Sequence, residues 1–152
     1  MLITSNNRQR GFSLVEVLIA LIIMSVGMLG IATLFVQGMQ AGRTSMFRHN
    51  AVILVGDVAD RIRANPTAGA AYTAVGGADS GCVGLGTICS QPQMASHDIF
   101  LWTQQAAETL PAGTVEVIFD GAVTPPTYAI TARWTEAGEN LDYGILIPVR
   151  TN

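Results

Sequence analysis

The chemistry that this sequence could perform is concentrated near its start, where one carboxylate stands inside an apolar run. Glu16 is the only charged residue between Phe12 and Val36, and Gly11 directly precedes the run. A carboxylate in a membrane-spanning helix costs on the order of 2.5 to 3.5 kcal/mol at the centre and less near an end, so it calls for a cationic partner. Cleavage between Gly11 and Phe12 would create an α-ammonium group close to Glu16, at the positive end of the helix dipole. The pattern therefore indicates a processing site with an acid placed for the new amine.

The apolar run is long enough to cross a membrane. As a helix, residues 12–36 would measure roughly 37 Å, against a hydrocarbon core of ~30 Å. Basic residues flank both ends in equal number, so charge alone does not set the orientation: Arg8, Arg10, Arg43 and Arg48. A cleaved secretory signal is one alternative, but its apolar region usually has only about 7 to 15 residues and ends in an Ala-x-Ala-like site. A simple signal anchor is another, and it gives no reason for Gly11 or Glu16.

The junction Gly11-Phe12-Ser13-Leu14-Val15-Glu16, followed by the apolar helix, resembles the class III signal of type IV prepilins and pseudopilins. In that family a prepilin peptidase on the cytoplasmic side removes the leader and methylates the exposed amine. The resemblance implies cleavage between Gly11 and Phe12, N-methylation of Phe12, and an N-inside, single-pass topology in the inner membrane. It also implies a filament in which Glu16 pairs with the Phe12 amine of a neighbouring subunit. Pairing of Glu16 with its own N-terminus is the alternative.

Beyond the apolar run the helical pattern continues and becomes amphipathic. One stripe is apolar: Ala51, Val55, Val58 and Ile62. The charged residues Asp57, Asp60, Arg61 and Arg63 face elsewhere, which indicates a solvated face with Asp57 one helical turn from Arg61. Pro66 ends the pattern because it cannot continue the helical ladder and disfavours helix for the residue before it. The sequence therefore predicts one helix from Phe12 to Ala64.

The run 57–66, together with the start of the chain, looks like minor pilins of the PilV type, the pilus modification proteins. This resemblance implies a minor pilin in a priming or tip complex that initiates type IV pilus assembly and influences adhesion and twitching motility. The implied partners are prepilin peptidase, other minor pilins, the major pilin, the inner-membrane assembly platform and a tip adhesin. The implied location is the inner membrane first, then the pilus at the cell surface. Many major pilins carry a proline within the apolar segment, and here none precedes Pro66.

Two other functions remain open on the sequence. A minor pseudopilin of a type II secretion system would share the signal and much of the fold. A single-pass, membrane-anchored extracytoplasmic binding domain is an alternative from a different functional class, because such a protein never enters a filament.

Cys82 and Cys89 are the only cysteines, and they lie in a segment rich in Gly, Ala and Ser that predicts an irregular connector over Thr67–Gln93. In an exported domain a disulfide is the expected state, and closing this eight-residue loop would contribute about 2.5 kcal/mol on the chain-entropy model. Two free thiols, or a metal half-site completed by His97, are the alternatives. In many pilins the disulfide instead staples the C-terminal region, so this upstream pair is a departure.

The second half of the chain predicts a short helix and then three strands. The helix is expected over Ile99–Leu110 after the capping candidates Ser96-His97-Asp98, with His97 at the surface. The strands are expected as an antiparallel meander: Val115–Phe119, Tyr128–Trp134 and Tyr143–Val149. Tyr128, Ile130, Ala132 and Trp134 alternate with more polar residues and form one packing face.

The predicted fold class is α+β. With the family resemblance it becomes a pilin-like ladle: a long N-terminal helix packed on a small antiparallel sheet, plus a short second helix. The expected organisation has four parts: a leader (1–11), a membrane or filament-core half-helix (12–36), an amphipathic half-helix (37–65) and an extracytoplasmic domain (66–152). Within the last part, 67–113 holds the connector and short helix, and 114–150 holds the sheet.

Composition argues against several functions. The chain has 8 basic and 11 acidic residues, and loss of Arg8 and Arg10 with the leader would leave a formal charge of about −5. It has no lysine and no cluster of arginine with aromatic residues, so nucleic acid is not an expected partner. It has no metal-spaced His/Cys set, phosphate-binding glycine loop or nucleophile motif, so we expect no enzyme, metal or cofactor.

Overall fold

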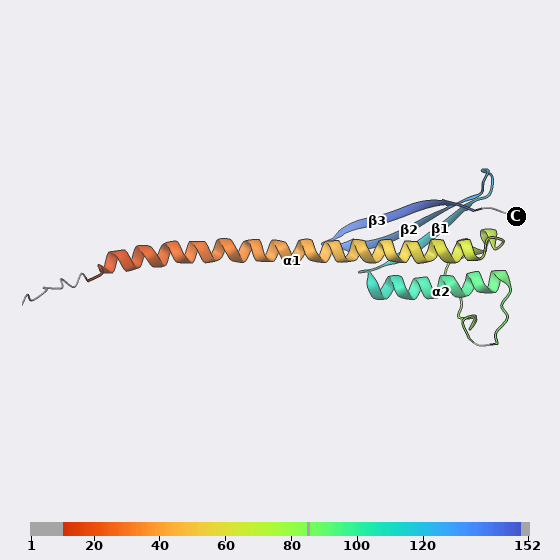
Figure 1. Ribbon diagram of the computed structural model, residues 1–152, viewed down its shortest axis with the longest axis horizontal. Helices are drawn as coiled ribbons and strands as arrows, with labels where there is room; N and C mark the ends of the chain where they lie inside the picture. Colours follow the sequence, from red (N-terminus) through yellow and green to blue (C-terminus); the bar gives the residue numbers. More distant parts are fainter. Residues whose placement is uncertain (1–10, 85, 150–152) are drawn as a thin grey trace, which may run out of the picture. The chain divides into compact units, whose positions relative to one another are not determined.

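The computed structural model describes residues 11–84 and 86–149, so the predicted leader lies outside the described residues apart from Gly11. The expected α+β fold is confirmed, with a long N-terminal helix, a second helix and a three-stranded antiparallel sheet (Figure 1). The elements follow one another in this order: α1 (Leu14–Ala64), the short 3-10 helix η1 (Gly69–Thr73), α2 (Gln91–Thr109), β1 (Thr114–Asp120), β2 (Thr127–Glu136) and β3 (Glu139–Pro148). The chain divides into two compact units, Met1–Gly42 and Arg43–Asn152.

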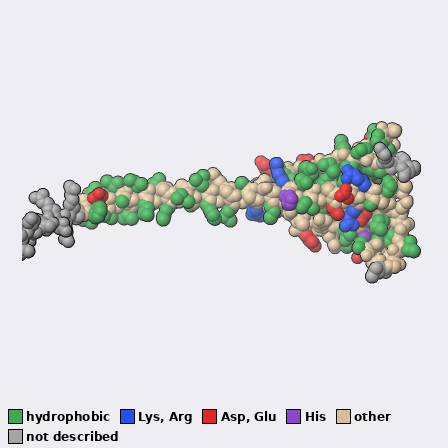
Figure 2. All heavy atoms as spheres, viewed as in Figure 1, with side chains coloured by type: hydrophobic (Ala, Val, Ile, Leu, Met, Phe, Trp, Pro, Cys, Tyr) green, Lys and Arg blue, Asp and Glu red, His purple; other side chains and the backbone are tan. Residues whose placement is uncertain are grey.

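The first unit contains the apolar segment of α1. Large hydrophobic side chains are exposed all around this helix, and its most apolar stretch has a mean hydropathy of 2.6 with none of it buried. Figure 2 shows these side chains in green along the visible face of the segment. By length and composition, α1 can cross a membrane.

The second unit has a core built from the remaining part of α1, α2 and the inner face of the sheet. The predicted stripe of α1 is buried completely: Ala51, Val55, Val58 and Ile62. Aromatic residues fill the centre, where Tyr72 of η1 stacks on Trp102 of α2 and meets Tyr128 of β2 edge to face. The amphipathic pattern of the sequence therefore marks the helix face that holds the domain together.

The sheet has the order β1-β2-β3 with antiparallel neighbours. The predicted packing face of β2 is confirmed, because all four of its residues are buried: Tyr128, Ile130, Ala132 and Trp134. β3 begins at Glu139 rather than at the predicted Tyr143. The reason is a two-residue turn, in which Ala137 and Gly138 adopt φ of 52° and 86°, so that Glu136 pairs directly with Glu139.

α2 begins at Gln91, eight residues before the predicted start at Ile99. Ser90 caps it instead of the Ser96–Asp98 segment, and the Ser90 backbone N–H donates to Gln93 Oε1 at 2.9 Å, with Pro92 in the first turn. His97 therefore lies inside the helix and is only 4% exposed, so the prediction of a surface histidine is wrong. The connector is also not wholly irregular, because it contains η1.

Candidate functional site

The start of α1 brings the predicted N-terminal site residues into one short stretch. Ser13 caps the helix: its carbonyl oxygen accepts the N–H groups of Glu16 and Val17 at 3.1 and 3.2 Å, and its Oγ accepts that of Val15 at 3.3 Å. The helix therefore begins at Leu14, two residues after the predicted Phe12. Gly11 and Phe12 remain outside the helix and are exposed.

Phe12 and Glu16 border the same groove. The other lining residues are apolar side chains of the next two turns: Val17, Ala20, Leu21 and Met24. Glu16 lies in the first turn, where the positive end of the helix dipole favours a negative charge. An amine on Phe12 and a carboxylate on Glu16 would thus stand at one end of an otherwise apolar surface.

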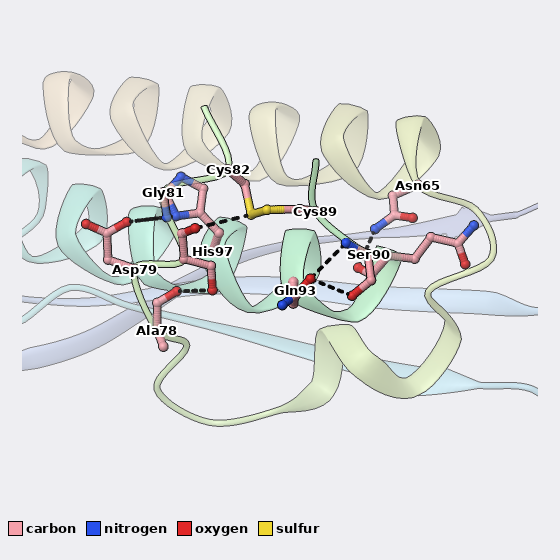
Figure 3. Close-up of a disulfide and its surroundings, with 11 residues drawn as sticks. Asn65, Ala78, Asp79, Gly81, Cys82, Cys89, Ser90, Gln93 and His97 are labelled. Carbon is pink, nitrogen blue, oxygen red and sulfur yellow. Dashed lines mark hydrogen bonds and ion pairs between the residues drawn. A yellow bond between two sulfur atoms is a disulfide. The ribbon is translucent and has the colours of Figure 1, made fainter. Parts of the chain in front are cut away.

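The connector is closed by a disulfide between Cys82 and Cys89, with Cα atoms 5.8 Å apart (Figure 3). Two hydrogen bonds hold the segment before it: the Gly81 N–H donates to Asp79 Oδ1 at 3.0 Å, and the Ala78 N–H donates to Ser96 Oγ of α2 at 3.0 Å. The connector is therefore fastened both by its own ring and to α2.

His97 does not join the cysteines in a metal site. Its Nδ1 lies 3.2 Å from Asp79 Oδ1, and both sulfur atoms are bonded to each other. Within residues 11–84 and 86–149, no group of three or more metal-ligating side chains occurs. The metal half-site is thus not formed in this structure.

A partly buried polar cluster, which the sequence analysis missed, ties α1 to η1 and α2. Arg61 donates to Asp57 on its own helix and to Asp98 of α2, at 2.9 Å each, and the Tyr72 hydroxyl donates to the other Asp98 oxygen at 3.0 Å. The predicted Asp57–Arg61 contact is present, but Arg61 is not simply part of a solvated face. The apolar spacing Ala95, Ile99, Trp102 and Ala106 could have revealed the longer α2, and with it a carboxylate on the buried side.

The pKa values of Arg61 and Tyr72 are raised in this cluster. Burial is the main cause of the raised pKa of the Tyr72 hydroxyl; the Asn65 hydrogen bond lowers this pKa, and the charge and hydrogen bond of Asp98 raise it. Burial lowers the pKa of Arg61, but the hydrogen bonds and charges of Asp98 and Asp57 outweigh it, so that this pKa is raised. Burial alone raises the pKa of Tyr128. The cluster therefore holds a charged guanidinium and a protonated phenol around one carboxylate.

Two known families match the chain. The prokaryotic N-terminal methylation motif matches residues 6–32, and the family described as Type IV pilin Tt1218 matches residues 33–100. The two matches adjoin and together span more than half of the chain. The protein is a type IV pilin. No curated protein and no solved structure matches it.

Membership of the pilin family explains the long apolar segment at the start of α1. Type IV pilins are structural proteins, processed by a prepilin peptidase and assembled with other pilins. The apolar segment of α1 anchors the pilin in a membrane before assembly into the pilus. The methylation motif includes Gly11, Phe12 and Glu16, the residues that the sequence singled out.

Proposed function

We propose that this pilin is a minor subunit of the PilV type, which joins a priming or tip complex, initiates type IV pilus assembly and influences adhesion and motility. The observation that carries the proposal is the methylation motif at the start of α1, joined to the run Asp57–Pro66 at its end. The proposal also holds that the protein waits in the inner membrane with its N-terminus inside, and then moves to the pilus at the cell surface.

Prepilin peptidase would cleave between Gly11 and Phe12 and methylate the Phe12 amine. Support comes from the exposure of both residues and from their position just before the Ser13 cap. A peptide bond inside a helix would have to unwind before it could enter a protease, whereas this one is already outside the helical ladder. The substrate segment is thus presented without loss of helix.

Glu16 would then drive assembly through the amine of a neighbouring subunit. In lipid, a carboxylate in the first turn is costly, and the cost falls when an ammonium group lies beside it. The side chains around Glu16 are apolar, so the attraction between its carboxylate and the neighbouring amine would be little screened. The pairing therefore favours a subunit that has been cleaved over one that still carries its leader.

Glu16→Gln tests this role, since it removes the charge at nearly constant shape. We expect normal cleavage and membrane insertion, but a loss of about tenfold or more from sheared surface filaments. Asp60→Asn, which removes an exposed charge from the second unit, is the matched control and should enter filaments normally. Wild-type incorporation of the Glu16→Gln protein would contradict the assembly role.

Deletion of the gene separates the possible functions. A minor pilin predicts fewer surface pili and weaker twitching, restored by the wild-type gene, with type II secretion unaffected. Defective secretion with normal piliation would instead support the pseudopilin, and wild-type protein that stays with the cells on shearing would support an anchored domain.

A further inference from the structure

β1 forms one edge of the sheet in the second unit, and η1 and α2 pack close to it. β1 stands at one end of the sheet order and pairs with β2 alone. Natural edge strands are commonly protected by proline, by charged side chains, by a bulge, or by a helix or loop that covers the edge. β1 contains neither proline nor lysine, and its register with β2 is unbroken from Thr114 to Asp120. Its charged residues are Glu116, which is paired with Arg133, and Asp120 at its end.

The ladder identifies which backbone groups point outward. The Val149 N–H donates to the Pro126 carbonyl at 2.8 Å, in step with the register of β2 and β3, so alternate residues of β2 direct their polar groups toward β3. The intervening residues of β2 direct theirs toward β1: Ala129, Thr131 and Arg133. Their partners in β1 are Ile118, Glu116 and Thr114. Three β1 residues therefore point their N–H and C=O groups to the free edge: Val115, Val117 and Phe119.

A groove of about 690 Å³ follows this edge. Every residue from Thr114 through Phe119 lines the groove. Because alternate residues of a strand point to opposite faces, the groove must run along the edge of β1. The opposite side is formed by Tyr72–Gly76, and α2 contributes Ile99 and Trp102. Its volume lies in the range of sites that hold a ligand, roughly 300 to 1,000 Å³.

The charge of the groove selects the occupant. Glu116 and Arg133 are the charged residues in its lining, and they neutralise each other through a contact of 2.7 Å. The remaining lining is mostly apolar or uncharged. A neutral groove in an acidic protein suits a neutral segment, and a row of free N–H and C=O groups suits an extended backbone.

We propose that the β1 edge binds an extended, uncharged strand of a partner protein, which adds a fourth strand to the sheet. Its backbone bonds to Val115, Val117 and Phe119, and alternate apolar side chains enter the groove toward Ile99 and Trp102. The proposal does not depend on which kind of pilus the protein serves.

The probe is the capped peptide acetyl-Ser-Thr-Val-Thr-Val-Thr-Ser-amide, added to the full-length protein in detergent micelles. Amide hydrogen exchange is followed residue by residue by NMR. We expect exchange at Val115, Val117 and Phe119 to slow by about tenfold or more, with little change at Glu116 and Ile118, which already bond to β2. The same peptide with methylated backbone nitrogens should give no protection.

Two variants provide a matched comparison. Ile118 and Leu146 both flank Ala129 on the outer face, one in each edge strand, and are 56% and 72% exposed. Ile118→Lys should weaken peptide binding by about tenfold, because it places a charge at the β1 edge, whereas Leu146→Lys should leave it unchanged. The proposal is wrong if the peptide does not slow exchange at the three outward amides of the wild-type protein, or if the methylated peptide slows it equally. Either result is decisive without the variants.

Discussion

The Arg61 guanidinium of α1 lies 2.9 Å from the Asp98 carboxylate of α2, and the Asp98 side chain is only 5% exposed. Tyr72 completes the enclosure by donating to the second carboxylate oxygen. A buried carboxylate is stable only while its oxygens are satisfied, so this pair makes the packing of α2 against α1 depend on charge as well as on apolar area.

Arg61→Ala should therefore destabilise the second unit. It leaves the Asp98 charge buried with one remaining donor, and we expect the free energy of unfolding to fall by about 2 kcal/mol. Urea unfolding of the full-length protein in micelles, followed by tryptophan fluorescence, measures it. Arg63→Ala removes an exposed ion pair with Asp60 and should cost less than about 0.5 kcal/mol. Equal losses in the two variants would show that the Arg61–Asp98 pair stabilises the fold no more than the exposed pair does.

Because of Tyr72, we expect the stability of the folded second unit to decline at alkaline pH. Its pKa is raised in the folded protein, chiefly by burial, so the phenol keeps its proton there while an unfolded tyrosine ionises near pH 10. The folded state therefore keeps a proton that the unfolded state loses near pH 10. The contribution of the Tyr72 hydroxyl to stability is complete below that pH, and above it stability falls by about 1.4 kcal/mol per pH unit.

Tyr72→Phe tests this linkage. At pH 7 the variant should lose about 1 kcal/mol, because Asp98 loses a donor. Between pH 10 and 11 its stability should decline less steeply than that of the wild type, as measured by the same urea unfolding at each pH. Parallel pH curves for the two proteins would count against a buried phenol as the cause.

The disulfide should contribute to stability through the connector. Replacing Cys82 and Cys89 together by serine removes the ring, and the chain-entropy model gives a loss of about 2.5 kcal/mol. Thermal unfolding with and without reductant measures it. The wild type should respond to reductant and the double variant should not. A reductant-insensitive wild type would mean that the ring does not stabilise the fold.

Gly113 occupies a place where no side chain fits. A Cβ there would overlap the Ala106 carbonyl oxygen and stand 2.7 Å from the Leu110 Cβ, at the end of α2. Gly113→Ala should destabilise the second unit by about 2 kcal/mol, because the overlap is with backbone that cannot move aside cheaply.

Gly56→Ala is the matched control, since the space around Gly56 in α1 is open. It should be neutral or stabilising by up to about 1 kcal/mol, because alanine favours a helix over glycine. A Gly113→Ala protein as stable as the control would refute the close contact. Urea midpoints of both proteins decide between these outcomes.

Much of the fold could be predicted because its signals are local. The apolar run, the stripe through Val55 and Val58, and the alternation around Ile130 each repeat with the period of one element. The start of α2 was predicted wrongly for the same reason: a capping candidate at Ser96 outweighed the true cap at Ser90, whose partner Gln93 is one turn away. Two capping signals close together in the sequence cannot be ranked without the packing of the helix face between them.

The sequence by itself predicts the N-terminal site, because Gly11, Phe12 and Glu16 lie close together in the chain, and Phe12 and Glu16 border one groove in the structure. Tertiary structure decided the contacts between distant segments. Arg61 meets Asp98 across 37 residues, His97 is buried rather than exposed, and a groove lies between the edge strand β1 and Tyr72–Gly76. Such relationships depend on how helices and strands pack, and periodicity describes only which face of an element is apolar, not what that face meets.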